Sequence, residues 1–214
     1  MGDESRAVAM LQAMATMQDD HNVLVHPQWR DQGHDYYRAI WVECAEMLDH
    51  FGWKWWKKQE PDSDQVKLEL VDIWHFALSE LLRADALTDD IALSLADVDA
   101  GDTDPEQFRQ SIEVLAESAL RSRSFELAPF INAMRALPMS YEELFELYIG
   151  KNVLNRFRQD HGYKTGHYKK LWQGREDNEH LIEVLQTLVC TPQDLPDRLY
   201  GELEDRYADA SRAD

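Results

Sequence analysis

The chain has 214 residues and a formal net charge of −19, from 41 Asp and Glu residues against 22 Lys and Arg. This charge repels a phosphate backbone and attracts cations, so we expect no general nucleic-acid binder. Hydrophobic residues make up 44% of the chain, enough for the core of one sizeable domain. Two cysteines, no signal peptide and no apolar run of membrane-spanning length favour a cytoplasmic protein that does not enter a membrane.

Helical periodicity prevails along the chain and no alternating strand pattern interrupts it, so we expect an all-α helical bundle. Residues 85–105 are acidic and aperiodic, which predicts a helix remnant followed by a loop, and a polar tail should follow Val189. We expect one domain over residues 1–214, with a rigid metal-binding part over about 1–90 and a mobile part over about 106–190. The expected helices cover residues 7–20, 36–50, 65–84, 107–122, 125–137, 141–157 and 177–189.

Two acidic pairs lie in the strongest of these helices. Glu43 with Glu46, and Glu69 with Asp72, each stand three residues apart, so each pair shares one helix face. Apolar residues frame both pairs, and a carboxylate in such surroundings is unfavourable unless it is paired or binds a metal. If the two helices pack antiparallel, the four carboxylates meet. Oxygen ligands at this density suit Mg²⁺.

Two other interpretations of the acidic pairs remain open. An isolated E-x-x-E pair is most often a solvated helix face, although apolar framing of both pairs favours the metal site. Alternatively, the carboxylates form salt bridges across the helix pair with Lys54, Lys57 or Arg38. In that case the chain could be a non-catalytic, acidic interaction protein.

A second stretch, residues 151–175, is basic in an acidic chain, with seven Lys and Arg residues against one acidic residue. Lys151, Asn155 and Arg158 share a helix face, and Gly162 and Gly166 follow, where the backbone can approach a ligand closely. This pattern predicts a phosphate clamp, which together with the metal helices indicates a metal-assisted reaction at a polyphosphate. A solvated basic face is the alternative. No phosphate-binding loop motif of the P-loop type occurs.

The acidic pairs resemble the E-x-x-E … E-x-x-D motif of the all-α nucleoside triphosphate pyrophosphatases. The blocks at residues 52–57, 69–76, 151–158 and 162–166 are similar, more narrowly, to the dimeric dUTPases, and the similarity runs from about residue 11 to residue 172. The resemblance implies a helical homodimer that hydrolyses dUTP and dUDP to dUMP and so controls the dUTP pool. A house-cleaning pyrophosphatase of the MazG or dCTP type, with another base preference, is the alternative within the superfamily.

The resemblance also assigns roles to individual residues. Two or more Mg²⁺ ions, with Mn²⁺ as a substitute, would bind the four carboxylates, and Glu46 would also orient the attacking water. Gln18 and Asn22 are the expected uracil-reading residues. The remaining substrate contacts fall to two groups: Trp55, His75 and Phe76 around the nucleoside, and Lys151, Asn155, Arg158, Tyr163, Lys164 and Lys170 on the phosphates or the sugar.

Overall fold

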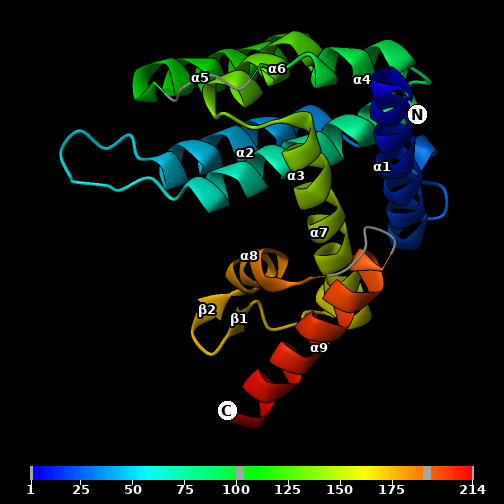
Figure 1. Ribbon diagram of the computed structural model, residues 1–214, viewed down its shortest axis with the longest axis vertical. Helices are drawn as coiled ribbons and strands as arrows, with labels where there is room; N and C mark the ends of the chain where they lie inside the picture. The colour runs from blue at the N-terminus through cyan, green and yellow to red at the C-terminus, as the bar shows by residue number, and fades with distance from the viewer. Residues whose placement is uncertain (1, 100–103, 190–193, 214) are drawn as a thin grey trace. The chain divides into compact units, whose positions relative to one another are not determined.

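The computed structural model is built almost entirely of α-helices (Figure 1), which confirms the predicted fold class. It describes residues 2–99, 104–189 and 194–213, with side chains as far as residue 210. The chain divides into two compact units, Met1–Glu146 and Leu147–Asp214. None of the described helices combines the length and the apolar character needed to cross a bilayer. The mobility expected of residues 106–190 stays a prediction.

The first unit is organised around the pair α2 and α3, which lie side by side (Figure 1). Helix α5 packs on α2, α6 packs on α5, and α1 lies against both α3 and α4. Helix α3 is the core element, and the Trp74 ring stacks on Phe130 with ring centroids 5.2 Å apart. The elements are α1 (Asp3–Val25), the short 3-10 helix η1 (Trp29–Asp31), α2 (Tyr36–Phe51), α3 (Ser63–Arg83), α4 (Asp89–Ala96), α5 (Pro105–Ser122), α6 (Leu127–Ala136) and the start of α7 (Tyr141–Asp160).

The loop between α2 and α3 is held at both ends. Gly52 ends α2 with φ at +91°, and Arg109 of α5 donates two hydrogen bonds, of 3.0 and 2.9 Å, to the Gly52 carbonyl oxygen. The side-chain oxygen of Gln59 accepts from the backbone N–H of Trp53, at 3.1 Å, within the loop. Asp62 caps α3 by accepting from the Gln65 N–H at 3.2 Å. Since the loop joins neighbouring helix ends, α2 and α3 run in opposite directions (Figure 1).

The second unit packs around the aromatic ring of Phe157. The rings of Tyr168, Trp172, Tyr200 and Tyr207 all lie with centroids 5.3 to 6.3 Å from it. A two-residue hairpin pairs antiparallel and turns through two residues with positive φ, a geometry typical of a tight hairpin turn. The elements are the remainder of α7, the 3-10 helix η2 (Tyr163–Thr165), β1 (Leu171–Trp172), β2 (Arg175–Glu176), α8 (Asp177–Thr187) and α9 (Leu195–Ala213).

One sequence-based expectation about the fold is wrong. The tail after Val189 is not merely polar, because α9 runs from Leu195 to Ala213 and buries Leu199 and Leu203 against the unit. Within residues 85–105, the expected helix remnant is α4. Residues 100–103 of the loop expected after it lie outside the described residues. Ser140 accepts a hydrogen bond from the Glu143 N–H at 3.1 Å and so caps the start of α7.

Candidate functional site

Three of the four predicted acidic ligands meet between α2 and α3. Glu43 comes from α2, and Glu69 and Asp72 come from one face of α3. One carboxylate oxygen from each lies within 4.8 Å of the others, and Glu69 is 5% exposed. We refer to these three residues as the carboxylate cluster. The buried side chains of Ile73 and Val66 belong to the same helix, so the acids stand in largely apolar surroundings.

Glu46, the fourth predicted ligand, is exposed on α2 and does not belong to the close group of three. Its charge nevertheless reaches Glu43, because it contributes to the raised pKa of that residue. Glu46 lies one helical turn from Glu43, and its side chain is exposed to solvent.

The electrostatics of the carboxylate cluster favour a cation. Burial, followed by the charges of Asp72, Glu69 and Glu46, raises the pKa of Glu43 from 4.5 to about 9. The Nε2 atom of His50 lies 3.5 Å from Glu69. A hard divalent ion bound here would favour the ionised form of each acid, and the donor set consists of oxygens, as Mg²⁺ prefers.

The neighbouring thiol does not suit a softer metal. Burial and the adjacent Glu43 raise the pKa of the Cys44 thiol to about 12, so it stays protonated and is a poor ligand. Two of the three basic residues considered as salt-bridge partners pair elsewhere. Lys54 contacts Asp49 on α2, and Arg38 contacts Asp35 at 2.9 Å. The carboxylate cluster therefore fits Mg²⁺.

A network of polar side chains joins α1 to α3. The Nε2 atom of Gln18 donates to Asn22 at 3.1 Å and to Ser79 at 3.0 Å, and Asn22 donates to the same Ser79 hydroxyl at 2.9 Å. The Nδ1 atom of His75 lies 2.6 Å from the side-chain oxygen of Gln18, so Nδ1 is the donor. Gln18, His75 and Ser79 are buried. The structure thus brings together Gln18, Asn22 and His75, the three residues predicted to bind the nucleoside. We refer to these three residues and Ser79 as the amide network.

Tyr36 extends the amide network from the start of α2. Its pKa is raised by burial, while the charge of Arg83 and a hydrogen bond with Ser79 act in the opposite direction. Phe76, which follows His75 on α3, is half-buried. Trp55 is different: it lies in the loop after α2, is 90% exposed, and contacts the Trp56 ring edge-on with centroids 5.4 Å apart.

The predicted basic face of α7 is organised around two residues at the start of α8. Arg158 donates from Nε and Nη2 to the two carboxylate oxygens of Asp177, at 2.8 Å each, and from Nη1 to Asn155 at 3.0 Å. Lys151 is 2% exposed and donates to Asn178 at 3.0 Å. Lys151, Asn155 and Arg158 do share one face of the helix. However, that face is buried against α8, so it is not a solvated basic surface.

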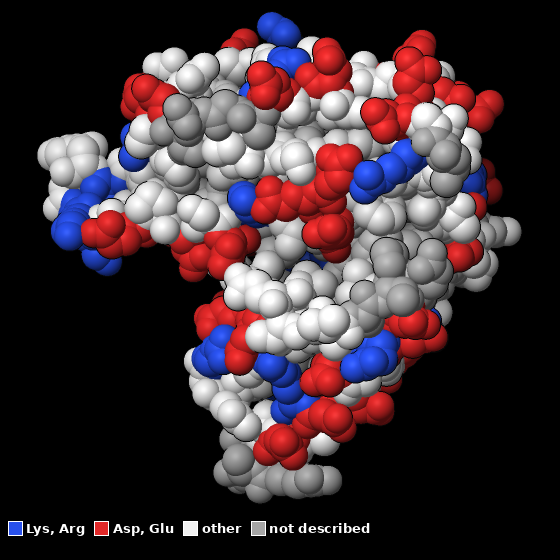
Figure 2. All heavy atoms as spheres, in the orientation of Figure 1, with Lys and Arg blue, Asp and Glu red and all other residues white. Residues whose placement is uncertain are grey.

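The other predicted phosphate contacts lie at the surface of the second unit. Tyr163 is 52% exposed on η2, between two glycines whose φ values are +84° and +73°. Lys164 is also exposed, and the Lys170 ammonium lies 3.9 Å from Glu176. Over the visible face, Lys and Arg side chains occur in small groups among more numerous Asp and Glu side chains (Figure 2).

A family model described as dUTPase matches residues 10–163 of the chain, which is 154 of its 214 residues. The chain belongs to the dimeric, all-α dUTPase family. The resemblance drawn from the acidic pairs and the basic block is thereby confirmed, and so is the expectation of an enzyme of the dUTP diphosphatase class. Its activity is the hydrolysis of dUTP or of a related nucleoside triphosphate. No curated protein matches the chain.

The family match spans both groups in the first unit, the carboxylate cluster and the amide network, and it ends at Tyr163. Asp177 and Asn178, which accept hydrogen bonds from Arg158 and Lys151, therefore lie beyond it, and so does Tyr168, which donates to Asp177. Sequence reasoning missed all three. The acidic run Glu176-Asp177 directly after a basic segment was the available signal, because a buried cation requires a counter-charge.

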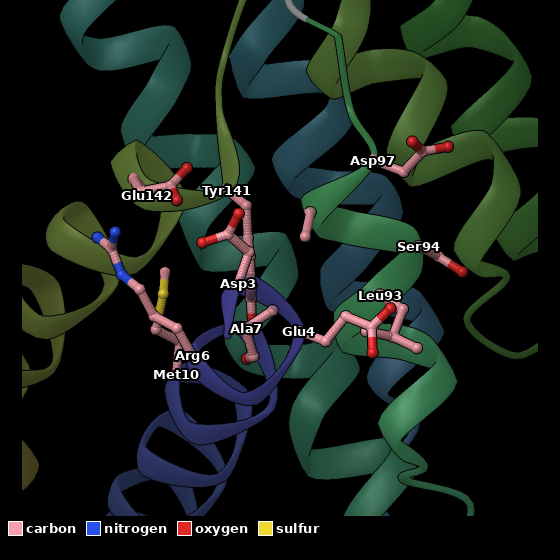
Figure 3. Close-up of a pocket in the computed structure, with 11 residues that line it drawn as sticks. Asp3, Glu4, Arg6, Ala7, Met10, Leu93, Ser94, Asp97, Tyr141 and Glu142 are labelled. Atoms are coloured by element: carbon pink, nitrogen blue, oxygen red, sulfur yellow. The ribbon is translucent and has the colours of Figure 1, made fainter. Parts of the chain in front are cut away.

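A pocket elsewhere in the dUTPase does not suit a nucleotide. It has a volume of about 660 Å³ and lies between the first turns of α1, the end of α4 and the start of α7 (Figure 3). Asp3, Glu4, Asp97 and Glu142 line it together with a single cation, Arg6. A triphosphate would be repelled there. Its α1 residues end at Met10, two helical turns before Gln18.

Proposed function

We propose that this dUTPase hydrolyses dUTP, and also dUDP, to dUMP in a reaction that depends on Mg²⁺, with Mn²⁺ as a substitute. The observation that carries the proposal is the carboxylate cluster, in which oxygens of Glu43, Glu69 and Asp72 lie within 4.8 Å of one another. The hydrolysis would release pyrophosphate from dUTP or phosphate from dUDP, and would so control the dUTP pool. The family resemblance adds a homodimer, and the cysteine usage favours the cytoplasm.

In this proposal the carboxylate cluster and Glu46, one helical turn from Glu43, would hold two or more Mg²⁺ ions. Mg²⁺ held there would polarise phosphoryl oxygens and lower the pKa of a coordinated water. Glu46 orients the attacking water and accepts its proton, a role that contributes about 10²- to 10⁴-fold to a rate. Its exposure supports this role, because the group that takes the proton must be able to reach water.

The amide network is proposed to read the base. Uracil presents two carbonyl acceptors and one N–H donor, and the Asn22 amide keeps one N–H and an oxygen lone pair to complement them. Gln18, whose two N–H groups donate to Asn22 and Ser79, orients that amide and offers its own oxygen as an acceptor. A flip of the Gln18 amide would disrupt its bonds with His75 and Ser79, so the network favours one orientation. Rejection of cytosine follows from this fixed orientation. Phe76 and Trp55 would complete the nucleoside site, where steric rejection of a 5-methyl group is worth about 1–3 kcal/mol.

The second unit is proposed to bind the phosphates. Arg158 supports this role because Asp177 fixes its guanidinium, while 12% of its side chain stays exposed. The exposed side chains of Tyr163, Lys164 and Lys170 supply further donors. Lys151 and Asn155 are also proposed to contact the phosphates or the sugar.

The test is a panel of deoxynucleoside triphosphates with Mg²⁺, in which released pyrophosphate is measured. We expect dUTP to be turned over at least tenfold faster than dCTP or dTTP. Asp72→Asn should lower kcat by about 10²- to 10³-fold, the usual loss when a charge-stabilising group is removed. Asp49→Asn is the matched control, because Asp49 is an exposed acid on α2 that pairs with Lys54.

Two outcomes would count against different parts of the proposal. Equal turnover of dCTP or dTTP would refute uracil recognition and favour a house-cleaning pyrophosphatase, with the metal site unaffected. Asp72→Asn with the activity of Asp49→Asn would refute the role of the carboxylate cluster. A chain with no turnover of any nucleotide, with or without Mg²⁺, would favour an acidic interaction protein.

A further inference from the structure

Tyr207 of the C-terminal helix α9 contacts the segment that carries the proposed phosphate-binding residues. Its ring stacks on the Tyr168 ring, with centroids 5.4 Å apart and an interplanar angle of 17°. Its hydroxyl oxygen accepts a hydrogen bond from the Lys169 backbone N–H at 3.2 Å. These contacts join residues 38 and 39 positions apart, and they lie beyond the part of the chain that the family model matches.

The contact continues from Tyr168 to Arg158. The Tyr168 hydroxyl donates to the Oδ2 atom of Asp177 at 2.8 Å, and the same oxygen accepts from the Nε atom of Arg158 at 2.8 Å. Asp177 is fully buried. Tyr168 therefore helps to fix the carboxylate that in turn fixes the guanidinium, and Tyr207 fixes the ring of Tyr168.

The segment between α7 and β1 also has contacts elsewhere in the second unit. The Tyr168 ring lies edge-on to the Phe157 and Trp172 rings, and Nε1 of Trp172 donates to the Lys169 carbonyl oxygen at 2.8 Å. Gly162 and Gly166 both have left-handed backbone conformations, which suit a turn but bring no side-chain packing. The hydrogen bond between Thr165 and His167, at 2.7 Å, is local. The ring stack and the backbone hydrogen bond from α9 add to these restraints at Tyr168 and Lys169.

We infer that Tyr207 is a positioning residue for phosphate binding: it holds Tyr168 and the Lys169 backbone, and through Tyr168 and Asp177 it orients Arg158. The inference rests on the proposed function, in which Arg158 and the exposed lysines bind the phosphates. Fixing a guanidinium before the ligand arrives reduces the ordering cost of binding. The binding of dUTP, which has one phosphate more than dUDP, should therefore depend more strongly on Tyr207.

Tyr200 provides a matched control on the same helix. Its ring lies edge-on to Phe157 at 5.3 Å, as the Tyr207 ring does at 5.5 Å, and its hydroxyl donates to Asp160 at 2.8 Å. Both tyrosines thus pack on Phe157, whereas the stack on Tyr168, the bond to Lys169 and the edge contacts with the His161 and Trp172 rings belong to Tyr207. Tyr200→Leu and Tyr207→Leu both remove a ring from Phe157, and Tyr207→Leu removes the larger set of ring contacts. A purely structural role predicts that KM changes in proportion to the loss of melting temperature in both variants.

The experiment compares the full-length wild type with Tyr207→Leu, Tyr207→Phe and Tyr200→Leu. For Tyr207→Leu we expect the KM for dUTP to rise about tenfold with little change in kcat, since binding is weakened equally before and during the reaction. Tyr207→Phe keeps the ring, so its KM should rise by no more than about threefold, the cost of one neutral hydrogen bond. Tyr200→Leu should also lower the melting temperature but keep KM within about twofold.

A nuclear magnetic resonance measurement reports on Arg158 without any nucleotide. The Nε–H signal of Arg158, assigned by its loss in Arg158→Gln, should shift and broaden in Tyr207→Leu and stay in place in Tyr200→Leu. An unchanged signal in Tyr207→Leu, or equal KM changes in the two leucine variants, would overturn the inference. A wild type that hydrolyses no dUTP would instead refute the proposed function, and the Arg158 signal would still decide the positioning role.

Discussion

Binding of Mg²⁺ to the carboxylate cluster should release a proton from Glu43. Burial, and then the charges of Asp72, Glu69 and Glu46, raises the pKa of Glu43 from 4.5 to about 9. At pH 7 a group with that pKa is about 99% protonated. Because a carboxylate binds a metal in its ionised form, each Glu43 that becomes a ligand should release close to one proton at pH 7.

Calorimetric titration of the chain with Mg²⁺, in two buffers of different ionisation enthalpy, counts these protons. We expect about one proton at pH 7, about half a proton at pH 9 and about a tenth at pH 10. Glu43→Gln should bring the count close to zero, and Asp49→Asn should leave it at about one. A wild-type count near zero at pH 7, or a count of one in Glu43→Gln, would refute the protonation of Glu43 and its role as a ligand.

The raised pKa of Glu43 also links stability to pH in the metal-free enzyme. The unfolded chain loses this proton near pH 4.5, whereas the folded chain keeps it up to about pH 9. The stabilising contribution is therefore complete below pH 4.5 and is lost as the pH rises through 9. With a chelator present, the melting temperature of the wild type should fall more steeply from pH 5 to pH 9 than that of Glu43→Gln. Parallel curves would contradict this linkage.

Two further predictions concern stability. Gly52→Ala should destabilise the chain by about 1–3 kcal/mol in denaturant melts, because φ is +91° and an added Cβ would lie 2.9 Å from the Gln59 Cβ; Gly33→Ala, with φ at +64° and no atom within 4 Å, should lose less. Asp177→Asn should cost about 3 kcal/mol by leaving Arg158 without its buried counter-charge. Burial raises the pKa of Asp177, but Arg158 outweighs it and holds that pKa below 3.8. The stabilisation should therefore be lost only as the pH falls through the lowered pKa. The stability of Asp177→Asn should lack this decrease at acidic pH.

The helix pair at the centre of the first unit could be predicted because its information is local. Asp35 precedes α2, Gly52 ends it, and both stand next to the residues that the sequence marks as helical. The spacing of Glu69 and Asp72 fixes their common face without any knowledge of the partner helix. The exposure of Glu46 is different in kind, because it depends on how far α3 covers α2, and no spacing within one helix determines that.

The surroundings of Arg158 could not be predicted because its partners are remote. Asp177 follows it by 19 residues and belongs to another helix, so only the packing of α8 on α7 brings them together. Helix α9 had a readable signal, since Leu195, Leu199, Leu203 and Tyr207 recur at every fourth position. Its many charged residues concealed that stripe. The stripe is what seats Tyr207 on Tyr168.

The pairing of Arg158 with Asp177 changes what the basic segment can contribute to phosphate binding. The pair carries no net charge, so the worth of Arg158 toward a phosphate lies in its fixed, planar donors. Lys164 and Lys170 are exposed, and each must be ordered when a ligand binds, at about 0.5–1.5 kcal/mol per side chain. Salt screens exposed charges far more than buried ones. The part of the affinity that falls with ionic strength should therefore come from the lysines, and the part that persists at high salt should depend on Arg158 and on the residues that hold it.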